Sequence, residues 1–278
     1  MSQLILQGSA LTQQLVAAIC EQVGGVSKLK EKYVQLKVGR AIDLAEITRL
    51  REMFPIDINM LPDKFSPEAV KLVVCDMDST LINIECIDEI ADFAGKKREV
   101  SSITEAAMSG ELDFAESLTQ RVALLKGLDV SVLERVFDER LSLNPGAELL
   151  LDHLKSSDIR FALVSGGFSF FTQKLKNQLD FAFCYANELE IVDQKLTGKV
   201  VGGIVDATVK ADYLQSLCDE LGIEPGCAVA IGDGANDLKM MALAGLGVAY
   251  HAKPKVQMRA NCTLNHSGLE GLLGLLDI

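Results

Sequence analysis

The sequence of 278 residues has no tryptophan, three histidines and fewer basic than acidic residues. The 27 Lys and Arg against 39 Asp and Glu give a formal net charge of −12. This balance argues against a surface that holds DNA, RNA or anionic lipid, because such surfaces need clustered cations. The sequence also lacks an apolar run of membrane-spanning length and a basic stretch typical of a signal peptide at its start. We therefore expect a cytoplasmic protein without nucleic-acid or membrane partners.

The seven cysteines are scattered, odd in number and free of CxxC pairs. This pattern predicts reduced cysteines in a cytoplasmic protein, and it excludes a disulfide framework. The histidines at 153, 251 and 266 are far apart in the sequence as well. A zinc site is therefore not expected.

The first part of the chain differs in pattern from the rest. Apolar spacing predicts helices over residues 11–23 and 44–53, with short strands at 4–6 and 33–37. Pro62 and Pro67 discourage regular structure and indicate a linker. We therefore predict a small α+β N-terminal region, residues 1–67, followed by a larger domain, residues 68–278.

From Lys71 onward, apolar runs of strand length alternate with amphipathic helical segments. The runs are residues 72–75, 161–164, 228–231 and 247–250. They predict an α/β fold with a doubly wound, Rossmann-like parallel sheet covered on both faces. Helical patterning at 87–93, 112–125 and 130–141 predicts a helical-bundle cap inserted after the first core strand, at about 84–144. Residues 188–206 contain Asp193-Gln194-Lys195 between β-prone runs, which predicts a hairpin.

Three of these strands run directly into polar sequence, at the sheet edge where ligands bind in doubly wound folds. Asp76 and Asp78 follow the first strand, where a helix-capping turn is the alternative. Ser165-Gly166-Gly167 follows the second strand and leads into a helical segment, an arrangement that suits an anion at a helix N-terminus. An ordinary strand-to-helix turn explains the same residues. Gly232-Asp233-Gly234-Ala235-Asn236-Asp237 follows the third strand.

Four carboxylates at one sheet edge would repel one another strongly in a partly dry site. They belong to Asp76, Asp78, Asp233 and Asp237. A cation relieves this repulsion, and a set of ligands made of oxygen atoms favours Mg²⁺, which shares its shell with water and phosphate. The sequence therefore predicts a magnesium site.

Together these residues resemble a known superfamily. Asp76-Met77-Asp78-Ser79-Thr80 resembles the DxDxT signature of the haloacid-dehalogenase-like phosphohydrolases, and Ser165, Lys210 and residues 232–237 follow in that family's order. Within the superfamily, Glu85, residues 118–122 and residues 165–168 are similar to the phosphoserine phosphatases. The resemblance covers about residues 71–275. Residues 1–67 are reminiscent of the degenerate ACT-like extensions that some bacterial members carry.

The resemblance implies a Mg²⁺-dependent phosphatase with an aspartyl-phosphate intermediate. Asp76 would be the nucleophile and Asp78 the general acid and base. The metal ligands would be Asp76, the Asp78 backbone carbonyl and Asp233, with Asp237 orienting this shell or binding through water. The phosphoryl group would be held by Ser165, Gly166 and Lys210, and Asn236 would touch the phosphate or orient Lys210.

The cap would select the substrate, which the resemblance identifies as the small molecule O-phospho-L-serine. Glu85 would accept from its ammonium, and Arg121 would grip its carboxylate. Met108 and Phe114 match pocket positions, and packing within the helices explains them equally well. Another phosphomonoesterase, a phosphotransferase and, from a different class, a non-catalytic phospholigand-binding regulator stay open as alternatives. A homodimer is left open too.

Overall fold

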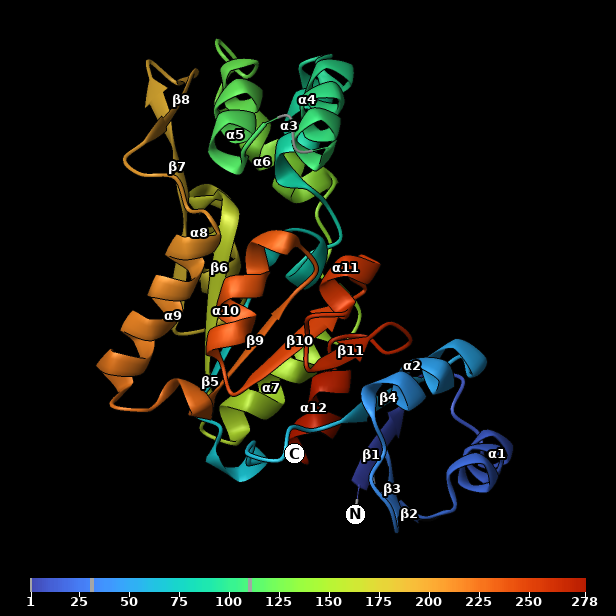
Figure 1. The fold of residues 1–278 in the computed structure, drawn as a ribbon. Coiled ribbons are helices and arrows are strands. Elements are labelled where there is room, and N and C mark those ends of the chain that lie inside the picture. Colours follow the sequence, from blue (N-terminus) through green and yellow to red (C-terminus); the bar gives the residue numbers. More distant parts are fainter. Residues whose placement is uncertain (1, 31–32, 110–111) are drawn as a thin grey trace.

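The computed structural model of the protein describes residues 2–30, 33–109 and 112–278, without the side chains of residues 105–109. A seven-stranded sheet of order β11-β10-β9-β5-β6-β7-β8 lies at its centre (Figure 1). Its neighbouring strands are parallel except for β7 and β8, which form an antiparallel hairpin. The strands are β5 (Leu72–Cys75), β6 (Arg160–Phe168), β7 (Phe183–Val192), β8 (Lys195–Val201), β9 (Ala228–Gly232), β10 (Leu246–Tyr250) and β11 (Cys262–Leu264).

Helices cover both faces of this sheet, which confirms the doubly wound α/β prediction. Every residue of β5 is buried, because successive side chains point to opposite faces and both faces are packed. Leu72 and Val74 belong to the apolar core shared with α9 (Ala207–Leu221), α10 (Leu238–Leu243) and α11 (Pro254–Gln257). Val73 and Cys75 belong to the core shared with α7 (Ala147–Ser156), α8 (Ser169–Leu179) and α12 (Gly271–Leu276).

Four helices form a group above the carboxyl ends of the strands (Figure 1). They are α3 (Cys86–Phe93), α4 (Lys97–Ser109), α5 (Phe114–Ala123) and α6 (Ser131–Glu139). We refer to residues 84–144, which include them, as the cap. Two crossing segments connect the cap to the core, and Asn83 N donates to Ser142 O (3.0 Å) between them. Helix α4 was not predicted, because charged and serine residues interrupt its apolar pattern.

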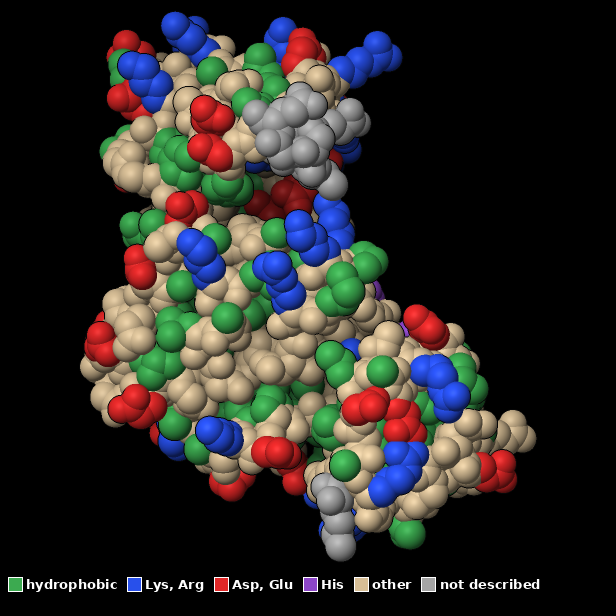
Figure 2. Space-filling view, viewed as in Figure 1, with side chains coloured by type: hydrophobic (Ala, Val, Ile, Leu, Met, Phe, Trp, Pro, Cys, Tyr) green, Lys and Arg blue, Asp and Glu red, His purple; other side chains and the backbone are tan. Residues whose placement is uncertain are grey.

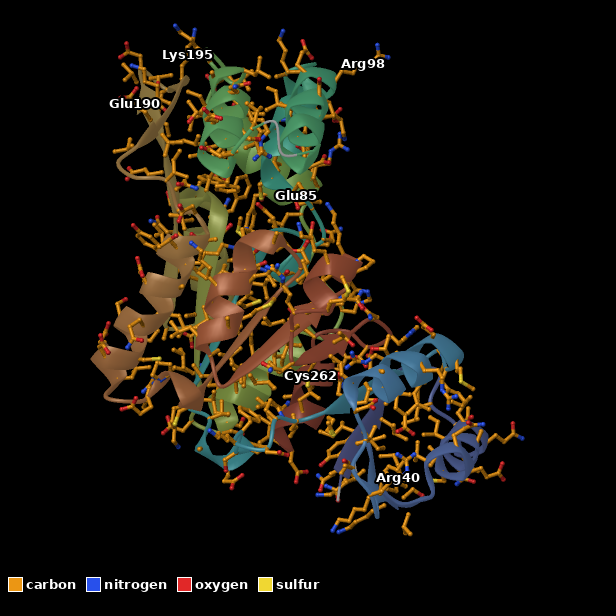
Figure 3. The ribbon with its side chains drawn as sticks, viewed as in Figure 1. Arg40, Glu85, Arg98, Glu190, Lys195 and Cys262 are labelled. Atoms are coloured by element: carbon orange, nitrogen blue, oxygen red, sulfur yellow. The ribbon has the colours of Figure 1, made fainter. Side chains whose placement is uncertain are left out.

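The β7–β8 hairpin extends from the core sheet to the cap. Leu196 N donates to Leu128 O and Val130 N donates to Gln194 O, both at 2.9 Å, across the hairpin and the loop after α5. Figure 3 shows Lys195 at the tip of this hairpin beside the cap. Asp193 and Gln194 have φ of 51° and 62°, so they make the tight turn that the sequence predicted.

The N-terminal strands form a separate antiparallel sheet of order β2-β3-β1-β4. Its elements are β1 (Ser2–Gln7), α1 (Gln13–Val23), β2 (Gly25–Leu29), β3 (Val34–Val38), α2 (Leu44–Met53) and β4 (Asp57–Met60). The two helices share an apolar core with one face of this sheet. Strands β2 and β4 were not predicted, since β2 is largely exposed and β4 has four residues.

The two sheets meet at β4 and β11, through side chains rather than a backbone ladder. Asn59 Nδ2 donates to Thr263 O and Asn59 Oδ1 accepts from Thr263 N, both at 2.8 Å. Asp57 accepts from the backbone of the loop after β11, and Cys262 lies beside β4 (Figure 3). The buried Asn59 and Asp57 therefore join the N-terminal sheet to the edge of the core sheet.

The helices are short. The longest described helix, α9, has 15 residues. None of the helices in the described part of the chain combines the length and apolar character that a membrane crossing requires.

Candidate active site

Asp76 begins the polar turn that follows β5. Its backbone N–H still pairs with Ile231 O (3.0 Å), while its carboxylate accepts from Met77 N (2.7 Å). Asp78 has an extended conformation and Ser79 has φ of 56°, which bends the chain sharply away from the sheet. Because the turn is not continuous extended backbone, the positions of Asp76 and Asp78 are set by this irregular turn and not by strand alternation.

A second acidic turn follows the neighbouring strand β9. Asp237 is fully buried, and its Oδ2 accepts from Gly234 N (3.0 Å). A Cβ on Gly232 would lie 2.3 Å from Asp237 Oδ2, so glycine is required for this close approach. Asp233 Oδ1 accepts from Thr80 Oγ1 (3.1 Å), which links the two turns.

Lys210, from α9, lies between the two acidic turns. It is fully buried, and its Nζ lies 2.7 Å from Asp76 Oδ1 and 2.8 Å from Asp237 Oδ1. Burial alone would lower the pKa of Lys210, but the negative charges of Asp237 and Asp76 outweigh burial and raise it. The lysine therefore stays charged between the two carboxylates.

One lysine does not neutralise this group of carboxyls. Burial, followed by the charge of Asp237, raises the pKa of Asp76 well above its ordinary value and that of Asp233 to about 6. Burial, followed by the charge of Glu85, raises the pKa of Asp78 to about 8. These shifts show an excess of negative charge in a site with little solvent.

The donor set fits a divalent cation. Asp76, Asp233 and Asp237 each offer a carboxylate oxygen, and these oxygens lie within 4.8 Å of one another. Hard cations such as Mg²⁺ and Ca²⁺ prefer oxygen ligands of this kind. The Asp78 backbone carbonyl stays a predicted ligand.

The second strand end carries the Ser165-Gly166-Gly167 turn. Ser165 is fully buried, and its Oγ accepts from Gly167 N (2.8 Å). The β6–β7 register shifts between Ser165 and Phe168, and α8 begins only at Ser169. The turn is therefore a strand bulge that leads directly into α8, in agreement with the expected turn before a helix. A Cβ on Gly167 would lie 2.7 Å from Asp78 Oδ2, so the turn packs directly against the first motif.

The cap closes over this centre. A Cβ on Gly166 would lie 2.8 Å from Phe114 Cζ, so the cap contacts the core across the cleft. Glu85 lies at the junction of cap and core (Figure 3), and its Oε1 accepts from Ser79 Oγ (2.7 Å). Arg121 Nε donates to Ser117 O (3.3 Å). The Met108 side chain lies outside the described residues.

Charged side chains lie in the cleft between the cap and the core. Figure 2 shows a recess between cap and core in which acidic side chains are visible. Burial, which outweighs the neighbouring charges, raises the pKa of Glu85 and lowers that of Arg121. Each of these two side chains would gain from an oppositely charged ligand group.

Asn236 is placed next to the acidic turn. Its Oδ1 lies 2.1 Å from the position that a Cβ on Gly234 would take. Lys210 Nζ bonds to the two aspartates and, among the described contacts, not to Asn236. None of the described contacts supports the alternative in which Asn236 orients Lys210, and contact of Asn236 with phosphate stays a prediction.

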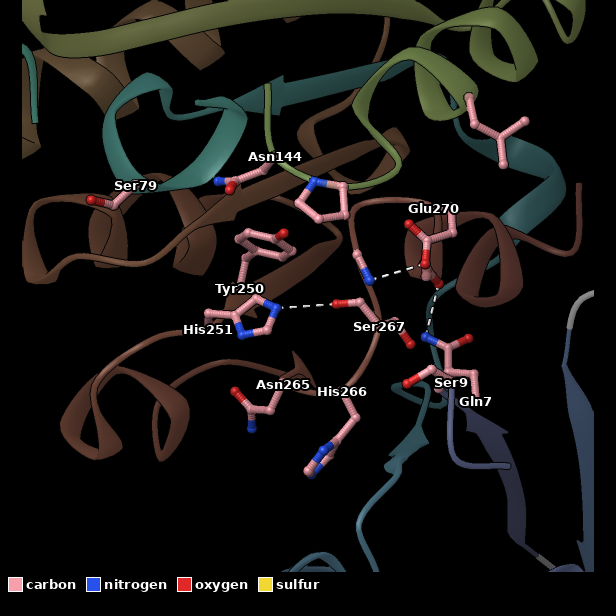
Figure 4. Close-up of a pocket in the computed structure, with 15 residues that line it drawn as sticks. Gln7, Ser9, Ser79, Asn144, Tyr250, His251, Asn265, His266, Ser267 and Glu270 are labelled. Carbon is pink, nitrogen blue, oxygen red and sulfur yellow. Dashed lines mark hydrogen bonds between the residues drawn. The ribbon is translucent and has the colours of Figure 1, made fainter. Parts of the chain in front are cut away.

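A cavity of about 830 Å³ lies behind the catalytic turn, between the N-terminal sheet and the core (Figure 4). Ser79, Asn144 and His251 line it, together with Ser267 and Gln7 from the junction of the two sheets. Among its described lining residues, Ser79 is the one that belongs to the Asp76–Thr80 motif. The cavity is therefore separate from the carboxylate centre.

Thr80 belongs to the DxDxT motif, but the motif by itself predicts no role for it. The structure assigns it the contact with Asp233, and its position four residues after Asp76 was the available signal. The sequence pattern also does not predict a role for Asn187, a buried residue that donates to Gly166 O. Nothing in the local sequence singles out Asn187, because its partners lie in other segments.

Comparisons with known proteins identify the family of the chain. A family model for haloacid dehalogenase-like hydrolases matches residues 70–245. A phosphoserine phosphatase from Polaromonas sp. is 53% identical over 211 residues, which are 74% of this chain and 89% of that protein. The crystal structure of a haloacid dehalogenase family hydrolase from Salmonella enterica serovar Typhi matches with a TM-score of 0.91 and 31% identity, covering 100% of this chain and 99% of that chain.

A probable phosphoserine phosphatase from Vibrio cholerae matches with a TM-score of 0.86 and 38% identity, covering 99% of this chain and 86% of that chain. The chain belongs to the haloacid dehalogenase-like hydrolase family. Within that family it is similar to the phosphoserine phosphatases.

Proposed function

We infer that this protein is a phosphoric monoester hydrolase that cleaves O-phospho-L-serine into L-serine and phosphate. The observation that carries this conclusion is the buried Asp76–Lys210–Asp237 ion-pair centre, found in a chain this similar to phosphoserine phosphatases. The reaction is the closing step of serine synthesis.

We propose Mg²⁺ as the cofactor, held by Asp76, Asp233 and the Asp78 backbone carbonyl, with Asp237 orienting this shell or binding through water. The grouped carboxylate oxygens and the raised carboxyl pKa values support this assignment. When bound, Mg²⁺ offsets carboxylate charge, which allows a dianionic phosphate to approach the site.

Asp76 acts as the nucleophile. A carboxylate oxygen attacks phosphorus, the bond between phosphorus and the serine oxygen breaks, and an aspartyl-phosphate forms. Asp78 donates its proton to the departing serine oxygen. The pKa of about 8 for Asp78 keeps this carboxyl protonated at neutral pH, as a general acid requires.

In the second step Asp78 acts as a general base. After serine leaves, Asp78 takes a proton from a water molecule, whose oxygen attacks phosphorus and breaks its bond to Asp76. The Asp76 carboxylate is restored, phosphate departs, and Asp78 is again protonated. Dividing the reaction into two steps lowers the barrier of one of the slowest uncatalysed hydrolyses known.

Ser165, the Gly166 N–H, Lys210 and Asn236 hold the phosphoryl oxygens. The hydrogen bond from Gly167 N to Ser165 Oγ supports this role, because it leaves the hydroxyl proton of Ser165 free to be donated. The charged Lys210 offsets the negative charge of the transferred group. Its bond to Asp76 also orients the nucleophile.

Glu85 and Arg121 recognise the serine part of the substrate, Glu85 through the ammonium and Arg121 through the carboxylate. The charges of Glu85 and Arg121 interact with each other and with Asp78, which supports this role. Phe114 closes the cleft over Gly166 and separates the reacting groups from bulk water. Replacing Arg121 by alanine should weaken activity on phosphoserine more than activity on an aryl phosphate.

The deciding experiment is a phosphate-release assay on phosphoserine, phosphothreonine, phosphoethanolamine and an aryl phosphate, each with and without EDTA. We expect phosphoserine to give the highest kcat/KM and EDTA to abolish activity. A preference for another ester would overturn the substrate assignment, and full activity in EDTA would overturn the metal. Adding an acceptor alcohol distinguishes the phosphotransferase, which would give a new phosphate ester instead of free phosphate.

For the N-terminal region, residues 1–67, we propose an ACT-like fold, supported by its antiparallel sheet with two helices on one face.

A further inference from the structure

Asn187, in β7, has a carboxamide that connects two segments of the site. Its Nδ2 donates to Gly166 O (2.8 Å), and its Oδ1 accepts from Val205 N (2.8 Å). The residue is 1% exposed, so water does not compete for these bonds.

The orientation of this carboxamide is determined by its partners. A backbone carbonyl can only accept a hydrogen bond, and a backbone N–H can only donate one. If the carboxamide were flipped, Oδ1 would face Gly166 O and the Nδ2 amino group would face the Val205 N–H. The asparagine therefore matches both partners in one orientation.

The bond to Gly166 O controls the peptide unit between Gly166 and Gly167. In a planar trans peptide, the carbonyl and the following N–H point in opposite directions. Asn187 holds the carbonyl side, and Ser165 Oγ accepts from Gly167 N on the other side (2.8 Å). Because neither glycine has a side chain to restrict rotation, Asn187 is what fixes this peptide and, through it, the Ser165 hydroxyl.

The bond to Val205 reaches the start of α9. The next residue, Asp206, is the N-cap of that helix, and its Oδ1 accepts from Thr208 N (2.8 Å) and Val209 N (2.9 Å). Lys210 N donates to Asp206 O (2.9 Å), so Lys210 lies in the first turn of the helix. Asn187 therefore ties the Ser165 turn to the beginning of the helix that carries Lys210.

We propose that Asn187 is a positioning residue for phosphate binding, which sets the Ser165 hydroxyl and the Lys210 ammonium at a constant separation. This inference rests on the proposed function for the roles of Ser165 and Lys210. Asn187 itself touches neither the substrate nor the reacting atoms. It acts through the backbone groups of Gly166 and Val205.

The test compares Asn187 with a second buried asparagine of the same kind. Asn59 is 0% exposed and also uses both ends of its carboxamide on backbone groups, at 2.8 Å each, but it lies at the junction of the two sheets and its Oδ1 accepts from Arg51 Nη2 (2.7 Å) as well. We expect Asn187→Leu to lower kcat/KM for phosphoserine by about 10²-fold, as misplaced catalytic groups do. The matched Asn59→Leu variant should lower the Tm and leave kcat/KM unchanged.

A second variant isolates the bond to Gly166. In Asn187→Asp one oxygen still accepts from Val205 N, while the other opposes Gly166 O. We expect this variant to bind inorganic phosphate more weakly than wild type, measured by calorimetry with Mg²⁺ present, and to have a lower kcat/KM. It also serves as the test if Asn187→Leu does not fold.

Two results would overturn the proposal. One is equal loss of kcat/KM in Asn187→Leu and Asn59→Leu, each assayed below its Tm. The other is wild-type phosphate affinity and kcat/KM in Asn187→Asp. Failure of the proposed function is a different result, in which wild type does not hydrolyse phosphoserine, and the phosphate-affinity comparison then still tests Asn187.

Discussion

The protein buries aspartates in two places, and it treats them differently. Asp57, at the junction of the two sheets, is 2% exposed and accepts from the backbone N–H groups of Asn265, His266 and Ser267 at 2.6–3.2 Å. Asp76, in the active site, is 5% exposed and lies among other carboxylates, with Lys210 as the cationic partner. Burial is alike in the two places, but the partners differ.

The difference separates a structural carboxylate from a reactive one. Several neutral N–H donors stabilise a buried negative charge without introducing another charge that would need neutralisation. In the active site, burial and then the neighbouring negative charges raise the carboxyl pKa values, so the carboxylate charge stays high in energy until a cation or a proton arrives. A site that must bind a metal and exchange protons requires the second arrangement, and a junction between sheets requires the first.

The largest expected effect comes from the reactive aspartate. Asp76→Asn removes the nucleophile while keeping its shape, and we expect kcat to fall by at least about 10⁴-fold, as in other enzymes that lose a nucleophile. Phosphate release in a stopped assay measures it. The matched control is Asp57→Asn, which should retain kcat in the fraction that is folded. Substantial hydrolysis by Asp76→Asn would contradict the covalent mechanism.

The structural aspartate should show the reverse pattern. Asp57→Ala leaves three backbone N–H groups without this partner, of which that of Ser267 is buried, and we expect the unfolding free energy to fall by about 3 kcal/mol. Urea denaturation monitored by circular dichroism measures this change. If stability were unaffected, the junction of the sheets would not depend on this carboxylate, and the contrast between the two sites would fail.

Metal removal tests the crowded carboxyls. Burial, followed by neighbouring negative charge, raises the pKa values of Asp233 and Asp78 from 3.8 to about 6 and about 8. Groups with raised folded-state pKa values bind protons more tightly when folded, so their contribution to stability is greatest at low pH and is lost as pH rises through those values. The metal-free protein should therefore have a lower Tm above pH 8, where both carboxyls are charged, than below pH 6, where they are protonated.

Mg²⁺ should raise the Tm more above pH 8 than below pH 6, because protons and the cation compete for the carboxyls of Asp76 and Asp233. Thermal scans with EDTA and with Mg²⁺ at each pH measure the difference. The Asp57→Asn variant, scanned in parallel, keeps the active site intact and should show the same metal effect. An equal Mg²⁺ effect at both pH values would be evidence against a carboxylate metal site.

The smallest effect belongs to a third kind of aspartate, on the surface. Asp277 accepts from Tyr33 Oη (2.6 Å) and Lys30 Nζ (3.0 Å), but its side chain is 52% exposed. Asp277→Asn should change unfolding free energy by less than about 1 kcal/mol, since exposed ion pairs are screened by water. A loss as large as that of Asp57→Ala would show that partner number, rather than burial, sets the effect.

Much of the sheet core was predictable because its strands are buried on both faces. The run at 72–75 is uniformly apolar, and the structure has β5 over those same residues. Strand β2 could not be predicted, since its residues after Gly25 are exposed and carry no alternating pattern. Strand β4 is stabilised by contacts with β1 and β11, which lie far away in the sequence.

The sequence by itself determined the chemistry of the reactive groups. Asp76 and Asp78 are two residues apart and Asp233 and Asp237 four residues apart, so each pair is presented by one local turn. Tertiary structure alone decided which polar residues would support these groups. Asn187 meets Gly166 across 21 residues and Asp57 meets Asn265 across 208, and no local pattern records such contacts. A buried polar side chain takes its role from the partners that the fold brings to it.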